Sequence, residues 1–279
     1  MGCSSSKQNT NKHAVISISK TPKLRWLGHA GFRLQFQDIQ NQSIERVVYI
    51  DPWLENPKIP DDLKNIVPDD ADLILITHGH FDHSSSAPSM IKKSMKKDAK
   101  IISNFELIQF YQRHHAISES QSIGMNKGGE LDLGYCKIQM VKADHSSGCM
   151  LPDSQHMTNG GDPCGFIIKA KDFNLYHAGD TNVFGDMAII DKLYQPTHLL
   201  LPIGGFYTMG PKEAAYATCR FLKSAKFVIP MHYGTFPLLK GTVEEFEKEF
   251  KKIQGEFRRA AITIIDPHKL LTENSILPL

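Results

Sequence analysis

The segment THGHFDH, residues 77–83, places three histidines and an aspartate within seven positions, and it begins where the apolar run DLILIT (72–77) ends. A run of this kind predicts a buried strand, and side chains that follow the end of a strand project into a loop where they can converge. Imidazole binds zinc, iron and manganese, and a carboxylate favours the harder of these ions. We therefore interpret His78, His80, Asp82 and His83 as metal ligands. The alternative is a solvated turn that happens to be rich in histidine.

The composition is that of a globular protein with a substantial core. The chain has 279 residues, of which 41% are hydrophobic and 9% are aromatic. Its 32 basic and 30 acidic residues leave a formal charge of +2, so there is no electrostatic case for binding nucleic acid. Five scattered cysteines without a CxxC pair indicate a reduced, intracellular setting. No apolar run approaches the roughly 18 residues of a membrane-spanning helix, so the body of the chain is expected to be soluble.

The N-terminus carries an acylation pattern. In MGCSSSK (1–7), Gly2 follows the initiator Met and Ser6 stands at the position preferred for myristoylation, while Cys3 could take a second acyl chain. Two lipid signals hold a protein on a membrane, whereas one does so only marginally. We predict a flexible leader over 1–20 and a catalytic domain over 21–279, on the cytoplasmic face of a membrane if the leader is acylated and otherwise in the cytoplasm. The alternative is a polar leader without lipid.

The rest of the chain alternates between strand-like and helix-like patterns. Short runs rich in branched and aromatic residues predict strands, and apolar residues at spacings of three and four predict helices. The predicted strands are 24–28, 32–36, 46–50, 72–77, 137–143, 165–170, 173–177, 198–202 and 226–230, and the predicted helices are 86–97, 104–113, 185–194, 211–223 and 242–253. No repeat or low-complexity linker interrupts them. Strands grouped early and again in the middle favour two sheets flanked by helices over a doubly wound parallel sheet.

Three later motifs accompany THGHFDH in a fixed order. KADHSSG (142–148) contains His145, YHAGDT (176–181) contains Asp180 in a turn flanked by glycine, and IPMHYGTF (229–236) contains His232. The HxHxDH motif after an apolar strand, together with these three, resembles the metallo-β-lactamase superfamily, and the resemblance extends from about residue 23 to 268. It implies an α/β fold of the αββα type, in which two mixed sheets are flanked by helices.

The same resemblance implies a centre with two divalent ions, with zinc expected and manganese or iron as alternatives. One ion would be bound by His78, His80 and His145 and the other by Asp82, His83 and His232, while Asp180 would bridge them. Two such ions hold a hydroxide between them at neutral pH, which indicates a hydrolase. Relatives that use iron for oxidation alter or bypass one metal position, and all seven positions are present here.

Other motifs are similar to those of a narrower branch. LGHAGF (27–32), IDPWL (50–54), LLPIGGFYTMGPKEAA (200–215) and IPMHYGTFP (229–237) resemble ascorbate-6-phosphate lactonases and N-acylphosphatidylethanolamine phospholipase D. Three function classes stay open: a hydrolase of a small ester, lactone or phosphoester, a membrane-attached phosphodiesterase acting on lipid head groups, and a non-catalytic scaffold stabilised by metal. The expected partners are a small-molecule or lipid substrate and, if the leader is acylated, a membrane surface. The sequence assigns no oligomeric state.

Several residues near these motifs are candidates for supporting roles. The resemblance implies that Asp51 orients a ligand, although a capping aspartate of a turn is the alternative. His29 would contact the substrate or support a ligand, or else be a core histidine, and a protonated Asp82 is one candidate for the proton donor in catalysis. The loop GGFYTMGP (204–211) would bring Tyr207 and Met209 to the substrate and its helix start would suit a phosphate, unless it only connects a strand to a helix.

The segment 146–163, after His145, is rich in turn-forming residues and is predicted to have no regular structure. Loops of this length in compact domains are often binding loops. The alternative is a disordered spacer.

Overall fold

The computed structural model describes residues 21–152, 156–272, 274–275 and 277. Gly2, Cys3 and the whole predicted leader lie outside these residues, so both the acylation and the division at residue 21 stay predictions. Among the described residues, no helix is long and apolar enough to cross a membrane.

Two mixed β-sheets form the centre of the fold. The first contains, in order across the sheet, β1 (Lys23–Gly28), β2 (Gly31–Gln37), β3 (Glu45–Ile50), β4 (Leu73–Leu75), β5 (Lys100–Asn104) and β6 (Ser122–Met125). The second contains β15 (Thr263–Ile264), β14 (Phe227–Met231), β13 (His198–Pro202), β12 (Phe173–His177), β11 (Cys164–Ala170), β8 (Lys137–Lys142) and β7 (Glu130–Asp132). Each sheet joins an antiparallel part to a parallel part, β3 to β6 in the first and β12 to β15 in the second.

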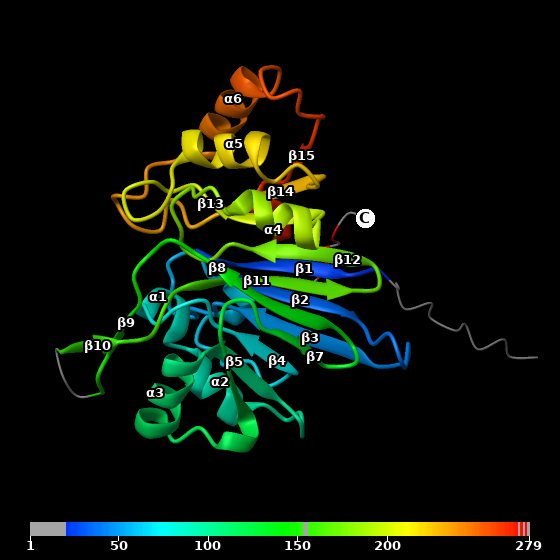
Figure 1. Cartoon of the computed structure of the whole chain (residues 1–279). Helices are drawn as coiled ribbons and strands as arrows, with labels where there is room; N and C mark the ends of the chain where they lie inside the picture. The colour runs from blue at the N-terminus through cyan, green and yellow to red at the C-terminus, as the bar shows by residue number, and fades with distance from the viewer. Residues whose placement is uncertain (1–20, 153–155, 273, 276, 278–279) are drawn as a thin grey trace, which may run out of the picture.

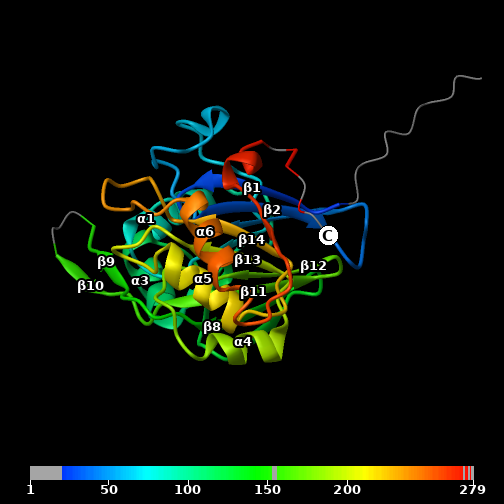
Figure 2. The same cartoon turned by 90° about the horizontal axis from the view of Figure 1, so that it is seen from above.

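Helices cover the outer face of each sheet, so the molecule has four layers (Figure 1). The first sheet is flanked by α1 (Phe81–Ser84), α2 (Ala87–Lys93) and α3 (Phe105–His115), and the second by α4 (Met187–Tyr194), α5 (Pro211–Arg220) and α6 (Val243–Ile253). Seen from above, α4, α5 and α6 lie over the strands of the second sheet (Figure 2). The predicted αββα sandwich of the metallo-β-lactamase fold is confirmed.

Alternation of side chains along the strands builds this layering. In β4, Leu73 and Leu75 point into the core between the two sheets, while Ile74 packs toward α2 and α3. In β13, Leu200 faces the same central core and Leu199 packs toward α4 to α6. A strand that is covered on both faces must be apolar at consecutive positions, which explains runs such as DLILIT and HLLLP.

Some predicted boundaries and one predicted loop were wrong. The strand predicted over 72–77 spans only Leu73–Leu75, and the helix predicted over 86–97 ends at Lys93. The segment 146–163 is not free of regular structure, because β9 (Gly148–Met150) and β10 (Met157–Asn159) pair as an antiparallel hairpin. Backbone pairing builds this hairpin, and strands of three residues are too short to show an apolar period. It extends from the left end of the sandwich in Figure 1.

Candidate metal centre

The predicted ligands and the two residues predicted to support them, His29 and Asp51, lie at one end of the sandwich, most of them just after the carboxyl end of a strand. His29 follows β1, Asp51 follows β3, His78 follows β4, His145 follows β8, Asp180 follows β12 and His232 follows β14. The short helix α1 begins within the HxHxDH motif and holds Asp82 and His83 on its first turn, with His80 directly before it. Six strand ends and one helical turn therefore bring residues that are up to 203 positions apart into one site.

The first group of candidate ligands is made only of histidines. Ligand atoms of His78, His80 and His145 all lie within 4.8 Å of one another. Nε2 of His78 is 2.9 Å from Nδ1 of His80. This is the set that the sequence assigned to the first ion.

The second group surrounds Asp82. Ligand atoms of His29, Asp82, His83 and His232 lie within 4.8 Å of one another. The carboxylate of Asp180 lies between the two groups, with Oδ2 2.9 Å from Nε2 of His232 and 3.5 Å from Nε2 of His145. Its other oxygen, Oδ1, is 3.3 Å from Nε2 of His83. A carboxylate in this position faces imidazoles of both groups, as a bridging ligand would.

Several of these atoms have no hydrogen-bond partner although they are buried. Nε2 of His83, Oδ1 of Asp180 and both ring nitrogens of His232 form no hydrogen bond of regular geometry, although Asp180 lies 2.9 Å from His232 and 3.3 Å from His83. A buried polar atom without a partner costs on the order of 1–3 kcal/mol, so such atoms are rare in the absence of a function or a ligand. Imidazole nitrogens and carboxylate oxygens that converge without partners form a donor set that fits a divalent cation.

The pKa values of the buried residues also indicate that the site favours positive charge. Burial would raise the pKa of Asp180, but the His232 and His83 imidazoles outweigh burial and hold this pKa well below its usual range. Burial would lower the pKa of His83, yet Asp180, Asp82 and Asp51 raise it well above its usual range. The buried carboxylates thus favour protonated rings at His83 and His232. A metal ion would supply this charge instead and would release those protons on binding.

Asp51 contacts the ring of His83, and Thr77 in turn holds the carboxylate of Asp51. Nδ1 of His83 is 2.8 Å from Oδ2 of Asp51, and the same carboxylate accepts from the backbone N–H of Thr77 at 2.8 Å and from its hydroxyl at 2.6 Å. A carboxylate on the second ring nitrogen fixes the orientation and tautomer of a ligating histidine. The side chain of Asp51 therefore contacts the ring of a candidate ligand, as the predicted supporting role requires.

His29 supports Asp82 in a parallel way. Nε2 of His29 is 2.9 Å from Oδ2 of Asp82, and Nδ1 of His29 is 2.5 Å from Oγ1 of Thr235. Burial, reinforced by His232, lowers the pKa of His29 to about 4. At neutral pH this ring is uncharged, so it donates one hydrogen bond to Asp82 and accepts one from Thr235. Both nitrogens are then used in hydrogen bonds, an arrangement that suits the predicted supporting role of His29.

Asp82 is not placed to hold a proton. Burial would raise its pKa, but His83, His232 and His29 outweigh burial and hold the pKa far below its usual range. The carboxylate therefore stays ionised, as a metal ligand must. These neighbours favour the ionised form of Asp82, and its role as the proton donor in catalysis stays a prediction.

We expect Thr235→Val to loosen Asp82 without unfolding the protein. Valine has the shape of threonine but cannot donate to Nδ1 of His29, so the ring loses the bond that fixes its tautomer. Loss of such an outer support typically costs about 10- to 100-fold in metal affinity or activity. Metal titration and kcat/KM of Thr235→Val should show a change of this size. Thr197→Val is the matched control, because this hydroxyl bonds Asn174 O at the far end of β13. Equal behaviour of the two variants would show that Thr235 does not act through His29.

The backbone is strained at three of these positions. His29, Asp51 and His232 have φ values of 54°, 45° and 55°, in the left-handed region that non-glycine residues rarely adopt. The backbone N–H of His232 donates to His29 O at 3.1 Å, so a hydrogen bond joins two of the strained turns. Strain of this kind persists where the surrounding structure enforces it, and it is concentrated at functional sites.

A cavity of about 700 Å³ opens onto the candidate ligands. Its floor contains His80, Asp82, His145, Asp180 and His232, and its remaining lining is Phe81, Ser146, Gly148, Met150, Met157, Tyr207, Phe236, Pro237 and Leu238. Tyr207 is therefore placed where a substrate contact was predicted. Met209 is not, because its side chain is buried in the core under α5. In a glycine-rich loop after a strand, two residues that are two positions apart can point in opposite directions. The sequence pattern does not indicate which of them points toward the cavity.

The loop before α5 does not offer a free site for phosphate. The carboxylate of Glu213 accepts from the backbone N–H of Gly210 at 3.1 Å and so caps the helix start. A carboxylate at this place repels a phosphate and satisfies a donor that the phosphate would need. The loop is better interpreted as a connection between β13 and α5 that carries Tyr207.

The sequence analysis did not identify Thr77, Thr235 or most of the apolar side chains that line the cavity. Both threonines belong to the quoted motifs, so a polar residue beside a predicted ligand was the available signal. Phe81 and Phe236 also lie inside those motifs, whereas Met150 and Met157 come from the hairpin that was predicted to be irregular. The ring of His177 is buried beside these motifs, with Nε2 2.9 Å from Ala30 O, as in a structural histidine of the core.

Comparisons with known proteins agree with this geometry. Residues 23–232 match the family model described as the beta-lactamase superfamily domain. A UPF0173 metal-dependent hydrolase of Myxococcus xanthus is 38% identical over 263 residues, which cover 91% of this chain and 88% of the relative. A protein of the same description from Rubrobacter xylanophilus is 41% identical over 233 residues, which cover 83% of this chain and 89% of the relative.

Solved structures show the same fold. Igni18, described as a novel metallo hydrolase from Ignicoccus hospitalis, aligns with a TM-score of 0.68 at 33% identity and covers 88% of this chain and 96% of that one. An isothiocyanate hydrolase from Delia radicum gut bacteria aligns with a TM-score of 0.61 at 21% identity, covering 88% of this chain and 96% of its own. At that identity the second alignment shows the fold alone.

Proposed function

Because this chain belongs to the metallo-β-lactamase superfamily and is a metal-dependent hydrolase, we propose that it binds two divalent ions and hydrolyses an ester, lactone or phosphoester with them. The observation that carries the proposal is the position of Asp180, whose two oxygens face imidazoles of both histidine groups and leave buried atoms without partners. A single ion would need only one of these groups.

The roles follow from the groups. His78, His80 and His145 would hold one ion, Asp82, His83 and His232 would hold the other, and Asp180 would contact both. Ions so placed would lower the pKa of a water molecule and polarise the oxygen of the scissile bond. Asp51 and Thr77 orient His83, and Thr235 and His29 orient Asp82. In the hydrolysis of an ester, the oxygen of water joins the carbonyl carbon, the bond to the alcohol breaks and the alcohol leaves with a proton.

The donor set favours zinc. Five of the seven ligands are imidazoles, which suit zinc well, while the two carboxylates would also accept manganese or iron. Elemental analysis of purified protein should find two ions per chain, and loading with each metal in turn should identify the most active form. A single ion per chain at full hydrolytic activity would contradict the proposal. Catalytically inactive protein with two bound ions would favour the metal-stabilised scaffold.

A second candidate function is a membrane-attached phosphodiesterase that acts on lipids of the N-acylphosphatidylethanolamine type. The apolar wall beside the ligands favours it, and the Gly2 and Cys3 pattern would place such an enzyme at its substrate. Release of phosphatidic acid from vesicles that contain this lipid tests it, with Asp180→Ala as the control. Turnover that disappears in the control supports the lipid activity, and absence of turnover by protein with two bound ions rejects it.

A further inference from the structure

We propose that the cavity beside the metal centre selects substrates with an uncharged apolar chain, such as a medium-length acyl or aryl group, next to the scissile bond. The inference rests on the proposed hydrolase function and adds the substrate class. It comes from the division of the cavity into a polar floor and an apolar wall.

The wall consists of side chains that are apolar and yet exposed. Phe81, Met150, Met157, Tyr207 and Leu238 are between 43% and 59% exposed, and all five line the cavity. Phe206, at 73% exposure, packs edge to face on Tyr207 at the same mouth. Six of the fourteen exposed large hydrophobic residues in the described part of the chain thus gather at one opening. A grouping of this kind marks a binding surface, whereas single exposed apolar residues do not.

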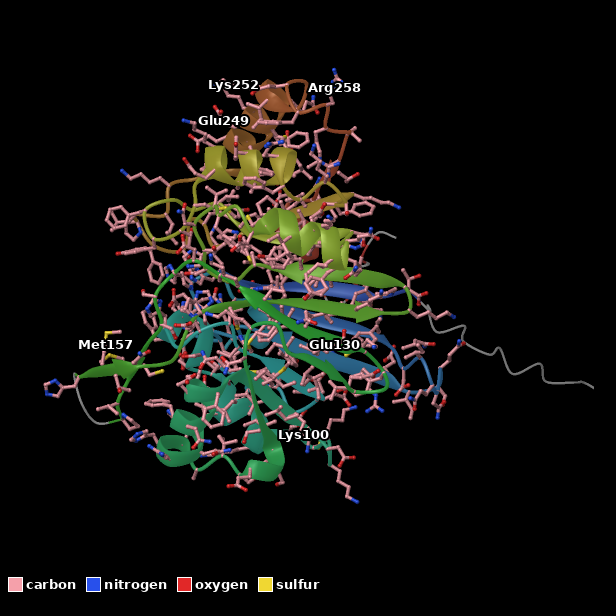
Figure 3. All side chains as sticks on the ribbon, viewed as in Figure 1. Lys100, Glu130, Met157, Glu249, Lys252 and Arg258 are labelled. Atoms are coloured by element: carbon pink, nitrogen blue, oxygen red, sulfur yellow. The ribbon has the colours of Figure 1, made fainter. Side chains whose placement is uncertain are left out.

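The wall comes from four separate segments. Phe81 belongs to α1, Met150 and Met157 to the β9–β10 hairpin, Tyr207 to the loop after β13, and Leu238 to the loop after β14. Figure 3 shows Met157 on the hairpin that projects at the end of the molecule where α1 lies. Buried Trp53 stacks on Phe236, and Phe236 packs against Phe81, which fixes one side of the wall from behind.

The two methionines make the opposite side adaptable. Met150 and Met157 are directly opposite each other in the hairpin, and the methyl end of Met157 lies over Gly148. A side chain at position 148 would meet that methyl group at 2.3 Å, so the glycine leaves room for it. Methionine is unbranched and polarisable, and it adjusts to apolar ligands of varied shape.

The charged residues that line the cavity argue against a phosphorylated sugar or lactone as the substrate. No lysine or arginine is found among the described residues that line it, and its only formal charges are those of the ligands on the floor. A phosphorylated sugar or lactone needs a cation or a free helix start at the end remote from the scissile bond, and the nearby start of α5 is capped by Glu213. An apolar chain needs neither, and it would cover the exposed wall.

The zinc-loaded full chain should therefore prefer longer acyl chains. We would measure kcat/KM for p-nitrophenyl acetate, butyrate, hexanoate and octanoate. Burial of each added methylene against the wall should raise kcat/KM about twofold or more, roughly sixtyfold from acetate to octanoate. The double variant Met157→Ser/Leu238→Ser should lower the ratio of octanoate to acetate by about tenfold or more, because both changes are on the wall. Ile189→Ser, an equally exposed change on α4 outside the cavity, should keep the wild-type ratio.

A binding measurement separates the pocket from the chemistry. The uncharged dye Nile red should bind the zinc-loaded protein, and the double variant should bind it about tenfold more weakly while Ile189→Ser binds it as the wild type does. Equal kcat/KM for acetate and octanoate in the wild type would overturn the inference, and so would a preference for p-nitrophenyl phosphate over the octanoate ester.

Two further results extend the test. The first decides whether the apolar chain of the substrate belongs to a free ester or to a lipid, and the second tests the inference even if no substrate is hydrolysed. Hydrolysis of dissolved octanoate ester but not of dioctanoyl phosphatidylcholine micelles would identify a free ester, and the reverse would identify a lipid. If protein with two bound ions hydrolyses nothing, the proposed function fails, and the Nile red affinities of the three proteins still decide whether the wall binds an apolar chain.

Discussion

Asp180→Asn should lower kcat/KM about a thousandfold or more and should also weaken the binding of the second metal ion. Asparagine keeps the size of the side chain but removes the charge that faces His232, His83 and His145. With that charge gone, one oxygen must serve both groups and the two ions repel each other without a shared anion. A thousandfold loss corresponds to about 4 kcal/mol of transition-state stabilisation.

Metal titration and steady-state kinetics of Asp180→Asn, at saturating zinc, test this expectation together. The variant should bind one ion tightly and the second weakly, and excess zinc should not restore turnover. Asp186→Asn is the matched control, because Asp186 precedes α4 and its carboxylate forms only an exposed ion pair with Lys142. If Asp180→Asn keeps two tight ions and near wild-type turnover, the carboxylate does not bridge the centre and the two-ion proposal fails.

The fold was predictable because its signals are local. The apolar run DLILIT and the histidines after it lie within twelve residues, and alternating runs such as FRLQF report which face of a strand is buried. The candidate ligands could be proposed for the same reason, since most of them stand just after a strand whose pattern is readable. Strands β9 and β10 were missed because three residues carry no period, and their pairing depends on backbone hydrogen bonds across the hairpin.

The supports of the ligands and the wall of the cavity depend on contacts between distant segments. Thr235 and His29 are separated by 206 positions, and no pattern in either motif specifies that they meet. Met209 and Tyr207 are two positions apart in one loop, yet one is buried in the core and the other lines the cavity. The direction of a side chain in an irregular loop is fixed by what packs around it. A sequence pattern therefore indicates the chemistry of a site more readily than its shape.

Gly204→Ala should destabilise the protein and disturb the second ion together. Gly204 follows β13 closely, and a Cβ atom there would lie 2.2 Å from the carbonyl oxygen of His232 and 3.1 Å from a methyl group of Leu239. Atoms do not approach so closely, and the oxygen belongs to the backbone, which cannot rotate away. Steric overlap in a packed region costs about 1–3 kcal/mol, and a backbone clash should reach the upper end of that range.

The clash would act on a strained position. His232 has a φ of 55° and receives support from the bond between its N–H and His29 O, so a shift of its carbonyl group would also move the imidazole that faces Asp180. Differential scanning calorimetry should show a fall in Tm of roughly 6–10 °C, since about 3 kcal/mol corresponds to such a shift in a chain of this size. Metal titration should show that the second ion binds more weakly. Gly185→Ala is the control, because a Cβ atom at that glycine meets nothing within 4 Å. If both variants melt within a degree of the wild type, the strand end at β13 tolerates displacement, and the strained turn at His232 does not depend on close packing against Gly204.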